Sequence, residues 1–328
     1  MKHIEFDNHL RSSYSFALEE YIMRNSEFND EYFLFWRTRP TLMIGRFQNT
    51  IQEINSQFVK DNHLDVVRRN SGGGAIYTDE NCWQFSFITW KEDGQDKDFR
   101  NFTKPVIEAL AKLGLDAEFS GRNDLMAGGK KFSGNAQFGI KNRFLHHGTV
   151  LFDTNLDNLI KSLNVGDEKV VSKGIKSVRE RVTNIKGFLN DPDLSALDFR
   201  NSMIALLKQD METIYLTEEQ RIEIEELENR KFLTWDWNYG NSPEFNLSRS
   251  KRFAGGKLEI YLNVKKGIIT ECSIYGDFFG TADISVICNL VRGVKYERNE
   301  LFKILNNAED AHKFQQISVE DLVSCFVE

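Results

Sequence analysis

A run of three glycines beside two arginines is the first place in this sequence that could hold an anion. Residues 68–77 are RRNSGGGAIY and follow a short apolar stretch typical of a strand. Glycines let backbone N–H groups approach a ligand without an obstructing Cβ, and consecutive N–H groups can form an anion-binding nest. The arginines add charge that suits a carboxylate or a phosphate. A glycine bulge or hairpin tip flanked by surface charge is an equally good interpretation of this segment alone.

A second candidate combines one acidic residue with two lysines. The segments are GRNDL at 121–125 and GKKFSGNAQ at 129–137. If they form paired strands, Asp124 and a lysine converge from neighbouring positions. Asp124 could then hold a magnesium ion and the lysine could meet an oxyanion. The alternative is that 128–131 is a solvated turn with exposed lysines.

Two adjacent histidines, His146 and His147, lie in a third segment that is typical of a strand. Neighbouring residues on a strand point to opposite faces, so the pair does not predict a zinc site. We expect one of the two to be packed or hydrogen-bonded.

The segment 173–184, KGIKSVRERVTN, concentrates cations in a long loop without regular periodicity. Long loops in compact domains are often functional. These cations could close over a polyphosphate or an acyl phosphate, although such a run is more often a solvated surface.

Composition limits the classes of protein to consider. The chain has 328 residues, which favours two domains, and a net charge of −7, which argues against a general nucleic-acid binder. The four cysteines are far apart, so reduced cytoplasmic thiols are expected, and Cys82 in an apolar stretch predicts a buried structural thiol. No apolar run is long enough for a membrane span and no signal-peptide pattern opens the chain, so we expect a cytoplasmic protein.

The elements that must position these residues follow from periodicity and turn residues. Short apolar runs separated by glycines predict an antiparallel or mixed sheet, and the tail predicts a small α+β domain that begins between Asn238 and Ser250. The expected strands are 32–36, 41–44, 65–69, 75–78, 83–89, strand signals within 117–153, and 258–264 with a partner that runs through Ile274. The expected helices are 15–23, 103–113 with Pro105 near its start, 155–163, 195–207, 217–228 with a capping box at Thr217, 283–291, 298–305 and 318–326.

Seven segments in this order resemble lipoate–protein ligases, which attach free lipoic acid to lipoyl domains. They are PTLMIGRFQNT (40–50), RRNSGGGAIYTD (68–79), GRNDL (121–125), KKFSGNAQ (130–137), HHGTVLFDT (146–154), SKGIKSVRERVTNI (172–185) and TWDWNYGNSPEF (234–245). The resemblance implies an α+β catalytic domain, residues 1–245, on a mixed, largely antiparallel sheet with flanking helices. A small α+β C-terminal accessory domain, residues 246–328, would follow it.

The resemblance also implies two half-reactions. Lipoate and ATP, with Mg²⁺, give lipoyl-AMP and pyrophosphate, and the lipoyl group then passes to a lysine of an acceptor lipoyl domain. That acceptor would be the glycine-cleavage H protein or an acyltransferase subunit of a 2-oxo acid dehydrogenase. No nucleic acid or membrane partner is expected.

The family's motifs transfer to this chain residue by residue. The lysine before Phe-Ser-Gly, Lys131 and not Lys130, is implied to be the catalytic residue. The implied lipoate-binding residues are Arg69, Gly73, Gly74 and His147. The implied ATP- or adenylate-binding residues are Gly74, Tyr77, Asp124, Lys131, Lys173, Lys176, Ser177, Arg179, Arg181 and Val182, with Asp124 also at the metal. The chain departs from a close family pattern at Thr78, where that pattern has histidine.

Two other functions stay open. An octanoyl- or lipoyl-transferase of the same fold would work without ATP, and several of these enzymes use a cysteine nucleophile. A non-catalytic module that binds lipoyl domains could also keep the fold. The long basic loop, the C-terminal segment and the intact Lys131 and Asp124 favour the ligase, and a biotin ligase is disfavoured because its glycine–arginine motif is missing.

Overall fold

The computed structural model describes residues 1–91, 98–163, 180–239 and 246–327. The chain forms two compact units that are interleaved along the sequence. The first unit contains residues 1–43, 51–68 and 76–238, and the second contains residues 44–50, 69–75 and 239–328. None of the helices in the described ranges is long and apolar enough to cross a membrane.

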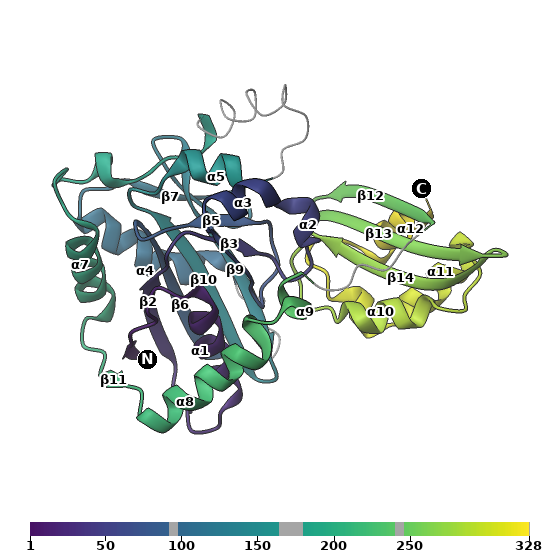
Figure 1. Cartoon of the computed structure of the whole chain (residues 1–328), viewed down its shortest axis with the longest axis horizontal. Helices are drawn as coiled ribbons and strands as arrows, with labels where there is room; N and C mark the ends of the chain where they lie inside the picture. The colour runs from purple at the N-terminus through teal and green to yellow at the C-terminus, as the bar shows by residue number, and fades with distance from the viewer. Residues whose placement is uncertain (92–97, 164–179, 240–245, 328) are drawn as a thin grey trace. The chain divides into compact units, whose positions relative to one another are not determined.

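An eight-stranded sheet forms the centre of the first unit (Figure 1), in the order β11-β1-β2-β6-β10-β9-β8-β7. Its strands are β1 (Lys2–Glu5), β2 (Tyr32–Arg37), β6 (Cys82–Trp90), β7 (Ala117–Ser120), β8 (Asp124–Ala127), β9 (Lys130–Ile140), β10 (Arg143–Leu151) and β11 (Thr213–Tyr215). Only β1 pairs in parallel, with β2 and β11, whereas the other pairs are antiparallel. The expected α+β class with a mixed, largely antiparallel sheet is confirmed.

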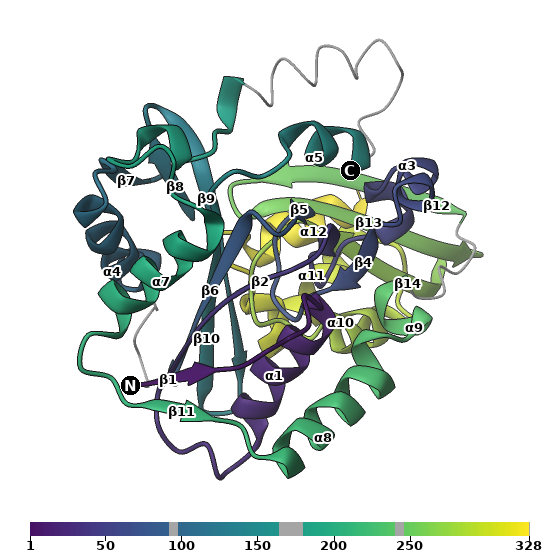
Figure 2. The same cartoon turned by 60° about the vertical axis from the view of Figure 1, so that its left-hand side comes forward.

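Helices cover both faces of this sheet (Figure 2). Helices α1 (Ser12–Arg24) and α8 (Glu218–Leu227) pack on one face, and α4 (Phe99–Lys112) and α7 (Ala196–Lys208) pack on the other. Strand β2 serves both cores because its side chains alternate: Leu34 and Trp36 enter one core, whereas Phe33 and Phe35 enter the other. The shorter elements are α2 (Thr50–Glu53), α3 (Ser56–Asp61), β3 (Thr41–Ile44), β4 (Asp65–Arg68), β5 (Ile76–Thr78), α5 (Leu156–Ser162), a 3₁₀ turn (Lys186–Phe188), a π-helical turn (Glu228–Phe232) and α9 (Trp235–Asn238).

The predicted start of α4 is wrong. The helix begins at Phe99, not at 103, because the side chain of Asp98 caps it by accepting from the backbone N–H of Arg100. Pro105 therefore lies inside the helix. The capping box of α8 is confirmed, since Thr217 and Gln220 exchange side-chain to backbone hydrogen bonds.

The second unit contains a three-stranded antiparallel sheet covered by helices. Its elements are β12 (Leu247–Phe253), β13 (Gly256–Lys265), β14 (Ile268–Gly276), α10 (Ile284–Val291), α11 (Arg298–Asn306), a 3₁₀ turn (Glu309–His312) and α12 (Val319–Val327). Leu258, Ile260 and Leu262 alternate into its core, as their spacing predicts. Strand β12 was not predicted because its polar and basic sequence, LSRSKRF, has no apolar alternation.

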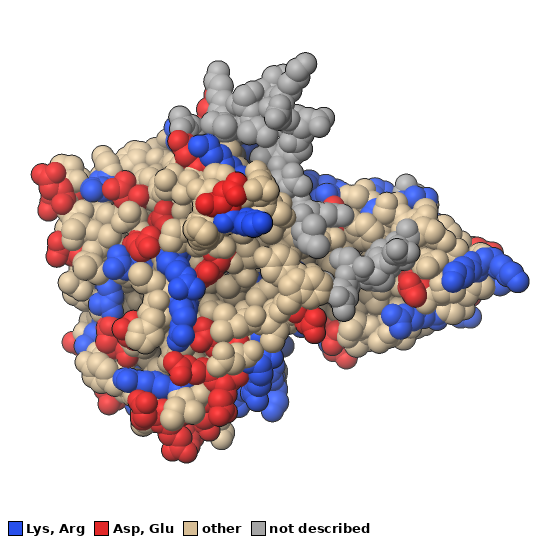
Figure 3. Space-filling model, viewed as in Figure 1, with Lys and Arg blue, Asp and Glu red and all other residues tan. Residues whose placement is uncertain are grey.

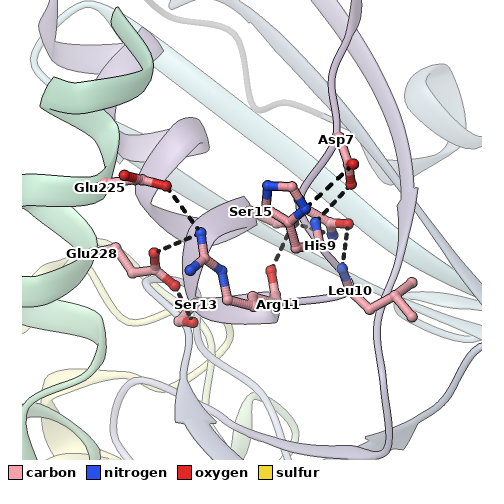
Figure 4. A network of polar contacts seen from close by, with 9 residues as sticks. Asp7, His9, Leu10, Arg11, Ser13, Ser15, Glu225 and Glu228 are labelled. Carbon is pink, nitrogen blue, oxygen red and sulfur yellow. Dashed lines mark hydrogen bonds and ion pairs between the residues drawn. The ribbon is translucent and has the colours of Figure 1, made fainter.

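A buried carboxylate joins α1 to the end of α8. Glu228 is 1% exposed, accepts a hydrogen bond from the hydroxyl of Ser13 at 2.6 Å, and lies 3.4 Å from the guanidinium of Arg11. Arg11 also contacts Glu225 at 3.3 Å (Figure 4). A buried carboxylate is stable only when donors compensate its lost hydration, so this contact ties the two helices together.

We expect Ser13→Ala to lower the free energy of unfolding by about 1–3 kcal/mol, because it leaves the Glu228 carboxylate short of a donor. Urea unfolding measures this difference. The matched control is Ser26→Ala at an exposed serine, which should leave the stability unchanged. Equal stabilities of the two variants would contradict this role of Ser13.

Candidate functional site

Lys131 and Asp124 meet on the β8–β9 hairpin. Their Nζ and Oδ1 atoms are 2.6 Å apart, and both side chains remain about one-third exposed, at 38% and 34%. Gly128 and Gly129 form the turn with positive φ angles of 54° and 73°. The expectation that paired strands bring an acidic and a cationic side chain together is confirmed.

A missing side chain keeps space for the lysine. Gly134 pairs with Asp124 across the ladder, and a Cβ at Gly134 would lie 3.1 Å from Nζ of Lys131. Phe132 is fully buried in the core. A packed Phe132 and an open Gly134 therefore let the Lys131 side chain fold over the strand toward Asp124.

His147 is held by a buried carboxylate on α1. Its Nδ1 lies 3.2 and 3.3 Å from the two oxygens of Glu19, which is 1% exposed. Ser86 donates to Glu19 at 2.6 Å, and the indole N–H of Trp36 donates to Ser86 at 3.1 Å. Glu19 was not predicted from the sequence, although an acidic residue within the apolar helix SFALEEYIM was an available signal.

The glycine segment lies in the second unit, where Arg69 closes it on itself. The guanidinium of Arg69 donates to the carbonyls of Gly72 and Gly74, each at 2.8 Å, and to the hydroxyl of Ser71 at 3.1 Å. Gly73 has a φ of +94°, a conformation that favours glycine, and its N–H donates to the carbonyl of Phe278 at 3.2 Å. The segment is therefore an ordered loop that the buried guanidinium of Arg69 stabilises by hydrogen bonds.

The described end of the basic segment reaches the lysine. Val182 forms a parallel bridge with Lys131, and the N–H of Thr183 donates to the carbonyl of Lys131 at 2.9 Å. Arg181 is exposed beside them. Four of the predicted residues, Lys173, Lys176, Ser177 and Arg179, lie outside the described residues.

Tyr77 and Thr78 lie in the interior. Tyr77 is 2% exposed, its hydroxyl accepts from the amide of Asn158 at 3.3 Å, and burial raises its pKa to about 12. Thr78 is fully buried and accepts from the Gln84 amide at 2.7 Å. At the position where a close family pattern has histidine, the side chain is thus part of a core hydrogen bond.

The acidic surface of α8 is unsuited to binding an anion, and the thiol of Cys82 is unsuited to act as a nucleophile. The outer face of α8 carries exposed acidic side chains, visible in the lower part of Figure 3, and would repel an anion. These are Glu218, Glu219, Glu223, Glu225 and Glu226. Cys82 is fully buried as predicted, and burial raises its pKa to about 12, so its thiol stays protonated at neutral pH.

No group of three or more acidic, histidine or cysteine side chains suited to a metal occurs among the described residues. Mg²⁺ usually takes only one or two protein carboxylates and completes its shell with water and substrate phosphates. The single carboxylate of Asp124, one-third exposed, fits that requirement.

Two family models match the chain. The lipoyl protein ligase A/B catalytic domain matches residues 11–208, and the bacterial lipoate protein ligase C-terminus matches residues 242–326.

Proteins similar to this chain over most of its length are named lipoate-protein ligases. Lipoate-protein ligase LplJ of Bacillus subtilis is 44% identical over 94% of this chain and 94% of its own length. Among solved structures, lipoate-protein ligase A bound with ATP has a TM-score of 0.63 at 30% identity, covering 73% of this chain and 98% of its own. A bipartite lipoate protein ligase from Thermoplasma acidophilum, studied with its E2 lipoyl domain, has a TM-score of 0.67 at 31% identity, with coverages of 75% and 98%.

Proposed function

The chain belongs to the lipoate–protein ligase family, whose enzymes activate lipoate and transfer it to protein, and we propose which of its residues carry each step. The catalytic domain is residues 1–245 and the accessory domain is residues 246–328. The observation that carries the assignment is the ion pair, about one-third exposed, between Lys131 of the KFSG segment and Asp124 of the GRNDL segment.

Activation of a carboxylate needs positive charge. Lipoate's carboxylate oxygen attacks the α-phosphorus of ATP and the bond to pyrophosphate breaks, so one anion must approach another. The ammonium of Lys131 supplies charge at the α-phosphate and at the oxyanion that develops when the acceptor lysine attacks lipoyl-AMP and AMP leaves. Lys131 therefore stabilises charge and does not act as a base.

Asp124 is the residue that would hold Mg²⁺. When bound, the ion neutralises phosphate charge. The same carboxylate contacts the Lys131 ammonium at 2.6 Å and so holds it at the site proposed for the phosphates.

Arg69, Gly73, Gly74 and His147 bind lipoate. Glu19 fixes the orientation of the His147 imidazole, and the glycine loop lets a ligand approach its backbone without an obstructing Cβ. Apolar burial of the lipoate tail contributes about 0.8 kcal/mol per methylene.

The adenylate contacts Gly74, Tyr77, Asp124, Lys131 and the basic segment, through Lys173, Lys176, Ser177, Arg179, Arg181 and Val182. The bridge between Val182 and Lys131 supports this, because it ties the segment to the reacting lysine. A segment that closes over lipoyl-AMP would also protect it from water.

The acceptor is a lysine of a lipoyl domain, in the glycine-cleavage H protein or in an acyltransferase subunit of a 2-oxo acid dehydrogenase. We place the reaction in the cytoplasm, a reducing compartment, because all four cysteines are buried free thiols.

The test of this function is isotope exchange between pyrophosphate and ATP. Exchange should require lipoate, the chain and Mg²⁺ together. Exchange without lipoate, or lipoyl transfer without ATP, would contradict the proposal.

Lys131→Ala should lower the exchange rate by about 10²-fold or more, the scale of losing one oxyanion donor. Lys130→Ala is the matched control, and its rate should stay within a few-fold of the wild type, because Lys131 and not Lys130 pairs with Asp124. Equal, mild effects of the two substitutions would place the catalytic charge elsewhere.

Several ATP-independent transferases use a cysteine nucleophile, and the buried thiol of Cys82 argues against that mechanism in this chain. Cys82→Ala should keep its exchange and transfer rates. Mass spectrometry of the wild-type chain incubated with an octanoyl carrier protein should detect no thioester on the chain. A thioester at Cys82, or loss of transfer in Cys82→Ala with its fold intact, would favour the transferase.

A further inference from the structure

A buried histidine that the proposed mechanism does not use is His146. It is fully buried, and its ring stacks on Phe102 at 4.8 Å and meets the edge of Phe99 at 5.4 Å. Its neighbour His147 points to the opposite face of β10, toward Glu19. Although it is packed in the aromatic core, His146 keeps both ring nitrogens in hydrogen bonds.

These hydrogen bonds fix the protonation state of His146. The amide nitrogen of Asn135 donates to the carbonyl of Asn123 at 3.0 Å, so its Oδ1 is the atom left to accept from Nε2 of His146 at 3.2 Å. Nε2 therefore carries the hydrogen, and Nδ1 accepts from the amide of Gln137 at 3.1 Å. Burial also lowers the pKa of His146 well below its ordinary value, so the ring is neutral.

Asn135 in turn clamps the residue before Asp124. Besides its side-chain bond, the backbone N–H of Asn135 donates to the carbonyl of Asn123 at 2.9 Å, and the amide of Asn123 donates back to the carbonyl of Asn135 at 2.6 Å. Three hydrogen bonds thus hold the start of β8 on β9. Asp124 is the next residue along the chain.

Gly148 makes room for this arrangement. A Cβ at Gly148 would lie 2.2 Å from Oδ1 of Asn135 and 2.4 Å from the Phe85 ring. Asn135 faces away from Gly134, over which Lys131 folds, because successive strand residues point to opposite faces. The segments GRNDL, GNAQ and HHGT therefore meet behind the Lys131–Asp124 pair.

We propose that His146 and Asn135 are positioning residues that hold the Lys131–Asp124 pair in place for adenylation. The inference rests on the proposed function. Both members of the pair are one-third exposed, so the backbone clamp at Asn123 contributes to where the carboxylate lies. A misplacement of 1 Å at a reacting group can cost about 10²-fold in rate.

The test is His146→Phe, which keeps an aromatic ring beside Phe102 but leaves Asn135 without its donor. The kcat of lipoate-dependent pyrophosphate exchange should fall by about 10–100-fold, and the KM for lipoate should change little, because His147 and the glycine loop are untouched. His146→Gln can place an N–H near the position of Nε2 and should recover most of kcat. This rescue separates a hydrogen bond to Asn135 from the bulk of the ring.

Gly148→Ala reaches the same residue without changing His146. Its methyl group must displace Oδ1 of Asn135 as well as the edge of the Phe85 ring, so the same loss of kcat at constant KM is expected. This second variant carries the test if His146→Phe does not fold.

The matched control is His3→Phe. His3 lies on β1 of the same sheet, is 2% exposed and packs against Phe33 of β2. The kcat of this variant should equal that of the wild type. The positioning role is overturned if His146→Phe keeps wild-type kcat, if KM rises in place of a fall in kcat, or if His146→Gln is no better than His146→Phe. A wild-type chain without exchange would instead overturn the proposed function itself.

Discussion

The register of β9 against β10 is the constraint on which the first unit depends. His147 pairs with Ala136, and Gly148 pairs with Asn135. In this register the neighbouring side chains of His146 and His147 face opposite sides of the sheet, toward Phe102 and Glu19 respectively. A slip of one residue would turn His147 away from Glu19 and His146 away from Asn135. The two cores, each filled with large aromatic residues, oppose such a slip because it would exchange polar and apolar side chains on both faces at once.

Two glycines on β9 and β10 leave space for neighbouring side chains because they have no Cβ. Gly134 leaves room for Lys131 on one face, and Gly148 leaves room for Asn135 on the other. Both have ordinary φ angles, so they are required for space and not for backbone conformation. In contrast, Gly73, Gly128 and Gly129 have positive φ and turn the chain. One residue type therefore meets two separate physical needs in the same protein.

Features that depend on residues close together in the sequence could be predicted, whereas contacts between distant residues could not. The glycine turn between strand-like runs indicated that β8 could pair with β9, and in the structure this pair brings Asp124 to Lys131. Glu19 was missed because the partner of a buried carboxylate comes from distant strands, through Ser86 and His147. The parallel pairing of the short β1 was missed for the same reason. The grouping of residues 69–75 with the second unit is non-local too, and no signal in those residues points to it.

This interleaving of the two units has a consequence during synthesis. The glycine loop is made well before Phe278, whose carbonyl accepts from the N–H of Gly73. The ring of Phe47, which stacks on Phe278 at 4.6 Å, also cannot make this contact until Phe278 has been made. Domains generally fold as units while the chain leaves the ribosome, and contacts between distant residues form late. The nascent chain can thus complete its large sheet, whose last strand along the chain ends at Tyr215, while residues 69–75 still lack these later partners, so the glycine loop takes its final form only after Phe278 has been made.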